Sequence, residues 1–144
     1  MTDITSFEDL KKELNKKIKN VMSTSVSKVA RQTLKEHIVT DVYEQYQPSE
    51  EGYERTGGLL QDINIDTIMI DDNTLSVRST RHDGLRDIGY IIEYGVGYDW
   101  QRSRIAQMQP YPRPFHENTY LEMSKGSFEK ALVSGLKAEG LYIS

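Results

Sequence analysis

Apolar residues recur at helical spacing along the first third of the chain and predict an amphipathic helical segment: Phe7, Leu10, Leu14, Ile18, Val21, Met22, Val26, Val29, Leu34, Ile38, Val42 and Tyr46. Thr5 and Glu8 have the form of a capping box, so the helix is expected to start near Ser6. An unbroken helix of about 40 residues would be about 60 Å long. We therefore expect a break at Ser23-Thr24-Ser25, which gives helices over 6–22 and 26–46.

After residue 58 the pattern becomes typical of short antiparallel strands. Isolated aliphatic residues stand among polar ones: Ile63, Ile65, Ile68, Ile70, Leu75 and Val77. Asp71-Asp72-Asn73 separates the two runs and predicts a hairpin turn. Residues 82–87 are polar and predict a loop. Residues 88–94 fit either a strand or a short helix, and the two alternatives stay open.

No hydrophobic period survives between residues 95 and 114, where glycine, proline and glutamine accumulate, so we expect a long loop at about 95–113. A last helix follows, weakened at Gly126 and stopped by Gly140. The order predicts an α+β fold, with N-terminal helices and a C-terminal helix packed on a small antiparallel β-sheet. We expect a core made of large apolar side chains: Phe7, Leu10, Leu14, Val29, Leu34, Ile38, Ile63, Ile65, Phe128, Leu132 and Leu136.

Length and composition narrow the class of protein. The 144 residues suit a single domain over 1–144, with 37% apolar and 28% charged residues. No apolar run reaches the length of a transmembrane helix, and the first residues are acidic where a signal peptide needs cations. These features predict a protein made in a cytosol that has no membrane partner. The chain has no cysteine, which excludes disulfides, thiolate metal sites and cysteine nucleophiles.

Charge is distributed unevenly along the chain. Residues 1–40 carry eight Lys and Arg against five Asp and Glu, whereas residues 41–100 carry four against thirteen. The acidic middle argues against nucleic-acid binding as the main role, because such binding needs a basic face. The alternative is a nucleic-acid-associated domain that uses the lysines of the first helix: Lys11, Lys12, Lys16, Lys17 and Lys19. A further interpretation is a solvent-exposed helix face without a ligand, because carboxylates in the same turns can form i, i+4 ion pairs with these lysines.

Few residues in the sequence could form a catalytic or metal-binding site. His82-Asp83 and His116-Glu117 lack the spacing of a metal site, so both histidines are expected on the surface in loops. Asp62, Asp66, Asp71 and Asp72 lack the rhythm of a calcium loop, and no phosphate-binding glycine motif is present. We expect no catalytic residue, no cofactor and no metal, and hence no enzyme.

Aromatic residues gather between residues 90 and 120 and alternate with arginines. Such residues are enriched in protein interfaces, so we expect contacts through Tyr98, Trp100, Arg102, Arg104 and Tyr111. Two other interpretations are a core with a plain loop, and stacking on single-stranded nucleic acid. The loop should become ordered on assembly, because its composition buries too little apolar surface on its own.

Three short elements occur in order along the chain: Arg55-Thr56-Gly57-Gly58-Leu59-Leu60, Tyr90-Ile91-Ile92-Glu93-Tyr94-Gly95 and Arg113-Pro114-Phe115. They resemble elements of the bacteriophage neck and tail-completion proteins, which join the DNA-filled head to a long tail. Val96 stands where that family usually has Thr, and polar residues follow Phe115 where it usually has small or apolar ones.

The resemblance implies a non-enzymatic virion protein that forms a homo-oligomeric ring, of six or twelve copies, in the neck. Its partners would be other neck, connector and tail-tube proteins, with DNA passing through the lumen without specific binding. The motif residues would be structural: Arg55, Gly57, Leu59, Tyr90, Glu93, Gly95, Arg113, Pro114 and Phe115. Arg55 can pair with a carboxylate such as Glu93, while Pro114 suits a first helical turn that Phe115 anchors.

Overall fold

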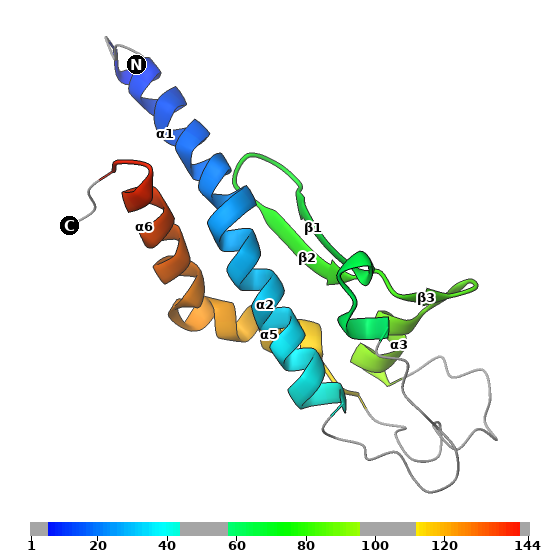
Figure 1. The fold of residues 1–144 in the computed structure, drawn as a ribbon. Coiled ribbons are helices and arrows are strands. Elements are labelled where there is room, and N and C mark those ends of the chain that lie inside the picture. The colour runs from blue at the N-terminus through cyan, green and yellow to red at the C-terminus, as the bar shows by residue number, and fades with distance from the viewer. Residues whose placement is uncertain (1–5, 44–57, 96–111, 142–144) are drawn as a thin grey trace, which may run out of the picture.

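A computed structural model describes residues 6–43, 58–95 and 112–141 of the chain. Within these residues a long N-terminal helical rod carries a β-hairpin on one side and a bent C-terminal helix on the other (Figure 1). The α+β architecture predicted from the sequence is thus confirmed. Most of the expected loop and the expected helix end near residue 46 lie outside the described residues.

The N-terminal rod consists of α1 (Phe7–Val21) and α2 (Ser27–His37). Its start lies close to the predicted place, but the cap is shifted by one residue. Ser6 is the N-cap and its hydroxyl accepts the backbone N–H of Asp9 at 3.1 Å. The hydroxyl of Ser6 thus satisfies one of the free amides of the first turn. The N-cap is therefore Ser6 and not the predicted Thr5.

The predicted break at Ser23-Thr24-Ser25 is wrong. A π-helical segment, Met22–Val26, joins α1 to α2, and the residues that flank it keep right-handed helical dihedral angles. The hydroxyls of Ser23 and Thr24 donate to the carbonyl of Asn20, at 3.0 and 2.7 Å. They bond back onto the preceding turn instead of capping a new helix. A second π-helical segment, Ile38–Tyr43, extends the rod further.

The strands β1 (Ile65–Met69) and β2 (Leu75–Ser79) form the predicted hairpin. They are antiparallel, with Ile65 opposite Ser79 and Met69 opposite Leu75. In the turn the carboxylate of Asp71 accepts the backbone N–H of Asn73 at 2.8 Å. The face that carries Ile65, Met69, Leu75 and Val77 packs on the helical rod, as the alternating pattern requires.

Residues 82–87 form a second, very short hairpin where a loop is predicted. The strands β3 (His82–Asp83) and β4 (Arg86–Asp87) pair directly, and Gly84 takes a φ of 62° in the turn. A two-residue turn needs a left-handed backbone, which glycine adopts without strain. The chain then enters α3 (Ile88–Tyr94), so the open choice for this segment is resolved as a helix.

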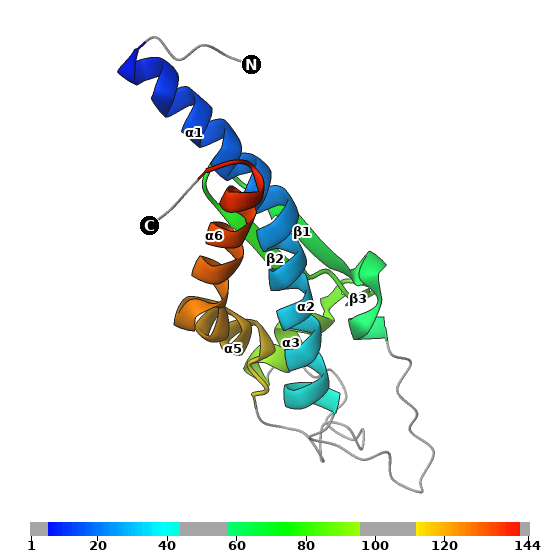
Figure 2. The same ribbon diagram turned by 60° about the vertical axis from the view of Figure 1, so that its left-hand side comes forward.

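The C-terminal helix is bent, and the bend lies at the predicted weak point. A π-helical segment, Met123–Ser127, joins α5 (Phe115–Glu122) to α6 (Phe128–Ala138). Gly126 within it has a φ of 136°, which interrupts the regular helix. Gly140 has a φ of 93° just after α6 ends. Figure 2 shows that the bend lets α6 run back alongside α1.

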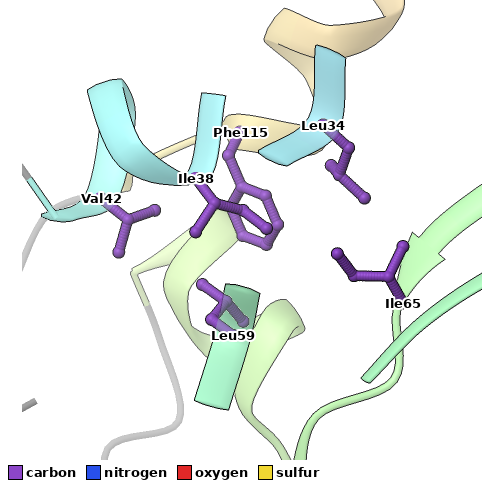
Figure 3. Close-up of a cluster of buried hydrophobic side chains, with 6 residues drawn as sticks. All are labelled: Leu34, Ile38, Val42, Leu59, Ile65 and Phe115. Atoms are coloured by element: carbon purple, nitrogen blue, oxygen red, sulfur yellow. The ribbon is translucent and has the colours of Figure 1, made fainter. Parts of the chain in front are cut away.

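The interior contains two apolar clusters. In the first, the fully buried ring of Phe115 lies among side chains from the rod, the hairpin and the 58–60 turn (Figure 3): Leu34, Ile38, Val42, Leu59 and Ile65. The second cluster joins the middle of the rod to α6 and comprises Val21, Met22, Val26, Ala131 and Leu136.

Four side chains predicted to be buried are exposed. Phe7, Leu10, Ile63 and Phe128 have exposed fractions of 78%, 38%, 83% and 37%. The periodic pattern identifies the apolar face of a helix, but it does not tell how far along that face a partner reaches. Of the others, Leu34, Ile38, Ile65 and Leu136 are buried, while Leu14, Val29 and Leu132 are half-buried.

Candidate functional site

A buried carboxylate on α3 lies at the junction of three elements. Asp87 begins α3 as its N-cap, accepting the backbone N–H of Tyr90 at 3.0 Å, and Gly95 ends it with a φ of 67°. This short helix points the side chain of Glu93 inward, where 6% of the residue remains exposed. Because a buried carboxylate needs donors, its surroundings define the site.

Glu93 caps the start of another helix. Its two carboxylate oxygens accept the backbone N–H groups of His116 at 2.7 Å and Glu117 at 3.0 Å, both in the first turn of α5. The N-cap residue of α5 is Pro114, which makes no side-chain cap bond. The carboxylate of α3 therefore supplies from outside the acceptor that a helix start requires, and its negative charge suits the helix dipole.

The imidazole of His116 links Glu93 to the β1–β2 hairpin. Its Nε2 accepts the backbone N–H of Ser79 at 3.0 Å, and its Nδ1 lies 3.1 Å from Oε2 of Glu93. Since the amide of Ser79 can only donate, Nε2 must be unprotonated, and the proton of the neutral ring sits on Nδ1 and is donated to Glu93. One side chain thus connects β2, α3 and α5.

The environment of Glu93 shifts its acidity in opposing directions. Burial by itself would raise the pKa of the carboxyl. The hydrogen bond from His116 and the backbone N–H groups of Glu117 and His116 stabilise the ionised form more strongly. The net result is a pKa below the ordinary value for glutamate, so Glu93 is ionised at neutral pH.

The motif residues that the structure describes lie around this junction. The backbone N–H of Arg113 donates to the carbonyl of Ile92 at 2.9 Å, and 5% of Arg113 is exposed. Phe115 and Leu59 meet in the first apolar cluster. The described parts of the three sequence elements are therefore brought to one place. Arg55 and Gly57 lie outside the described residues, so the predicted pair of Arg55 with Glu93 stays a prediction.

His116 is not the surface loop residue that the sequence predicts, because it is half-buried on α5 and bonded on both ring nitrogens. One signal could have found it. A helix that opens with Arg113-Pro114-Phe115 has no capping side chain of its own, so its first amides favour an acceptor from elsewhere in the chain at this junction. His82 is exposed as expected, in β3, with Nδ1 2.8 Å from the carbonyl of Thr80.

A groove of about 960 Å³ opens beside the junction and is called here the tyrosine groove. Three exposed tyrosines line it, and the rings of Tyr90 and Tyr94 lie 4.7 Å apart between centroids. Tyr120 of α5 contributes a third phenol. Exposed phenol rings offer a large contact area with polar tips, which suits a protein partner. The other lining residues include Asp87, Pro112, Pro114 and Glu117.

The contact residues predicted from the sequence cannot be placed on this surface. Tyr98, Trp100, Arg102, Arg104 and Tyr111 all lie outside the described residues. In the described part of the chain, no three His, Asp or Glu side chains come together in a way that could hold a metal ion. Within the same ranges, no helix is long and apolar enough to span a membrane.

Comparison with known proteins identifies relatives. A family model described as YomN matches residues 6–138. The chain is 38% identical, over 119 residues, to the SPbeta prophage-derived uncharacterized protein YomN of Bacillus subtilis (strain 168). That match covers 83% of this chain and 81% of the relative. No solved structure matches the chain significantly. The matched range contains all three sequence elements and the Glu93 junction, and the chain therefore belongs to the YomN family.

Proposed function

We propose that this chain is a non-enzymatic bacteriophage virion protein that forms a ring in the neck, between the head connector and the tail tube. The observation that carries the proposal is the convergence of the sequence elements that resemble neck and tail-completion proteins. Glu93 of the second element caps the helix that the third element opens, and Leu59 of the first packs on Phe115. The prophage origin given in the name of the Bacillus subtilis relative supports the phage context.

The distribution of charge fits a channel for DNA. Two exposed carboxylates at the β-hairpins, Asp71 and Asp87, form no ion pair within the described part of the chain, whereas Asp62 pairs with Arg31 and Lys35, and Asp72 with Lys19. If this side of the subunit faces the lumen, the channel wall repels phosphate. Each cation that paired with the DNA backbone would slow its passage, so an acidic wall favours ejection. The tyrosine groove then serves as a contact surface for a neighbouring neck or tail protein.

Deletion of the reading frame from a phage that encodes this chain tests the proposal. The expected lysate contains DNA-filled heads and separate tails under the electron microscope, and plaque titre is restored by supplying the chain from a plasmid. Mass spectrometry of purified virions should detect the protein. Complete, infectious virions made without the gene would overturn the proposal.

The alternative role in nucleic-acid binding depends on the lysines of α1. Two of them already bond within the chain. Lys17 donates to the carbonyl of Glu139 at 3.1 Å, and Lys19 pairs with Asp72 at 3.2 Å. A titration with duplex DNA at two salt concentrations separates the roles. Micromolar binding that weakens steeply with salt would favour the alternative, whereas a neck ring should show no such binding.

A further inference from the structure

The first half of α1 carries an apolar stripe without a partner in the described part of the chain. Phe7 and Leu10 are exposed and Leu14 is half-buried, at positions i, i+3 and i+7 of one helical face. The same face continues into Ile18 and Val21, which pack in the second apolar cluster. Lys17 and Asn20 of α1 donate hydrogen bonds to Glu139, just after the end of α6. Residues 7–16, about 15 Å of helix, thus project beyond α6 and the hairpin, as both ribbon views show.

A second apolar surface on the same chain is also open. A groove of about 590 Å³, called here the hairpin groove, lies between the β1–β2 hairpin and the bend of the C-terminal helix. Its lining contains no Asp, Glu, Lys or Arg. Ile70, at its rim, is 69% exposed. The apolar lining residues come from the rod, the hairpin and the bend: Met22, Val26, Ala30, Ile70, Leu75, Val77, Met123 and Phe128.

The stripe cannot fill the groove of its own chain. Phe7 and Met22 belong to one uninterrupted helical rod, fifteen residues apart, so the helix holds them about 22 Å from each other. No hinge lies between them, because α1 is regular from Phe7 to Val21. A stripe and a groove fixed at separate places on a rigid unit can meet only between two copies of the chain.

We propose that the exposed stripe of α1 docks in the hairpin groove of a neighbouring copy. This deepens the proposed function and rests on it, since it names the contact that builds the ring. An amphipathic helix seated in an apolar groove through anchors at i, i+3 and i+7 is a common mode of recognition. Because donor and acceptor surfaces differ, each added subunit leaves one of each free, and the contact repeats until the ring closes.

Charge complements the apolar fit. Lys11 follows Phe7 by one helical turn and flanks the stripe. Asp71 lies in the hairpin turn, between groove residues Ile70 and Asn73. Lys11 and Asp71 are both exposed, and neither forms an ion pair within the described part of its own chain. The carboxylate of Asp71 beside the groove therefore attracts the ammonium group of Lys11 on an incoming helix.

Light scattering after size-exclusion chromatography of the full chain tests the contact. The donor variant is Phe7→Asp with Leu10→Asp, and the acceptor variant is Ile70→Asp with Ser124→Asp. All four residues are exposed, so each variant should keep the circular dichroism spectrum and melting temperature of the wild type. The matched controls are Lys16→Asp, on the opposite face of α1, and Ile63→Asp with Leu85→Asp, at exposed positions outside the groove. Each changes the charge by the same amount as its test variant.

The wild type and both controls should form species larger than a dimer as concentration rises. Each test variant alone should be monomeric, with association at least about tenfold weaker. An equimolar mixture of the two should form a heterodimer and stop there, because one intact stripe and one intact groove remain between them. A monomeric wild type, test variants that assemble like the wild type, or a mixture that stays monomeric would each overturn the inference.

The two proposals fail in different ways. If the deletion phage makes joined, infectious virions, the proposed function is wrong even when the heterodimer forms. If the deletion phage loses its neck while the test variants assemble normally, the docking contact alone is wrong.

Discussion

At the scale of single residues, the capping of α5 by Glu93 explains why glutamate is needed at this position. The carboxylate satisfies two helix amides and the ring of His116 from a distance of more than twenty residues in sequence. An aspartate is one methylene shorter, and a glutamine carries an N–H₂ group that donates instead of accepting. Neither aspartate nor glutamine can therefore make the same set of hydrogen bonds as Glu93.

We expect Glu93→Gln to lower the free energy of unfolding by about 1–3 kcal/mol, because buried amides lose a charged acceptor. Urea denaturation followed by circular dichroism measures the change. The control is Glu117→Gln, an exposed carboxylate on the first turn of the same helix, which should change stability by less than about 0.5 kcal/mol. Equal effects of the two substitutions would show that the cap is not needed.

The acidity of Glu93 leads to a second prediction. Its pKa is lower in the folded chain than the ordinary value of 4.5, so the stability that it contributes is present above that value. This contribution is lost as the pH falls through the folded pKa. Denaturation between pH 6 and pH 3 should show a smaller loss of stability in Glu93→Gln than in the wild type. Parallel curves for the two proteins would contradict this prediction.

Sequence patterns predicted the structure correctly where the conformation of a residue depends only on adjacent residues in the chain. The turn at Asp71 and the bend at Gly126 depend on a few adjacent residues, and both were predictable. The role of His116 depends on β2 and α3 together, and no local pattern contains that information. The exposure of Phe7 escaped prediction for a similar reason, since burial depends on where another element ends.

At the scale of elements, the crossing of α1 and α6 depends on the absence of a side chain. A Cβ atom added at Gly135 would collide with Cγ1 of Val21 and crowd the side chain of Ser25. The glycine therefore lets the two helices approach closely. This approach brings Ala131 and Leu136 of α6 into contact with the apolar side chains of the rod in the second apolar cluster.

Gly135→Ala should lower the free energy of unfolding by about 1–3 kcal/mol, through overpacking. Replacing glycine by alanine inside a helix ordinarily stabilises it by about 1 kcal/mol, so the expected sign is reversed. Thermal unfolding measures the effect, with Ser134→Ala, at the exposed neighbouring position, as the control. A stabilised Gly135→Ala protein would show that the helices can move apart without cost.

At the scale of the whole molecule, two apolar clusters join the described helices and the hairpin, and most of the predicted contact loop lies outside the described residues. The sequence predicts that residues 95–113 contact a neighbouring subunit or tail protein through Trp100, Arg102 and Arg104. Large aromatic and guanidinium side chains are the usual anchors of such contacts.

Trp100→Ala should therefore leave the unfolding temperature of the isolated subunit nearly unchanged and reduce incorporation into virions. Complementation of the deletion phage, scored by titre and by the amount of the variant in purified particles, measures the defect. Gln101→Ala, a polar neighbour in the same segment, serves as the control. A Trp100→Ala subunit that unfolds would place this side chain in the core instead.

The packing of α6 on the N-terminal rod also determines when the chain can finish folding. Val21, Met22 and Val26 leave the ribosome about 100 residues before Ala131 and Leu136, which cover them in the second apolar cluster. Until α6 has been synthesised, this apolar surface stays uncovered on every nascent chain, and polysomes carry many such chains side by side. Contacts so distant in sequence also close slowly. Synthesis of this protein therefore passes through a stage that is prone to aggregation and favours protection by chaperones.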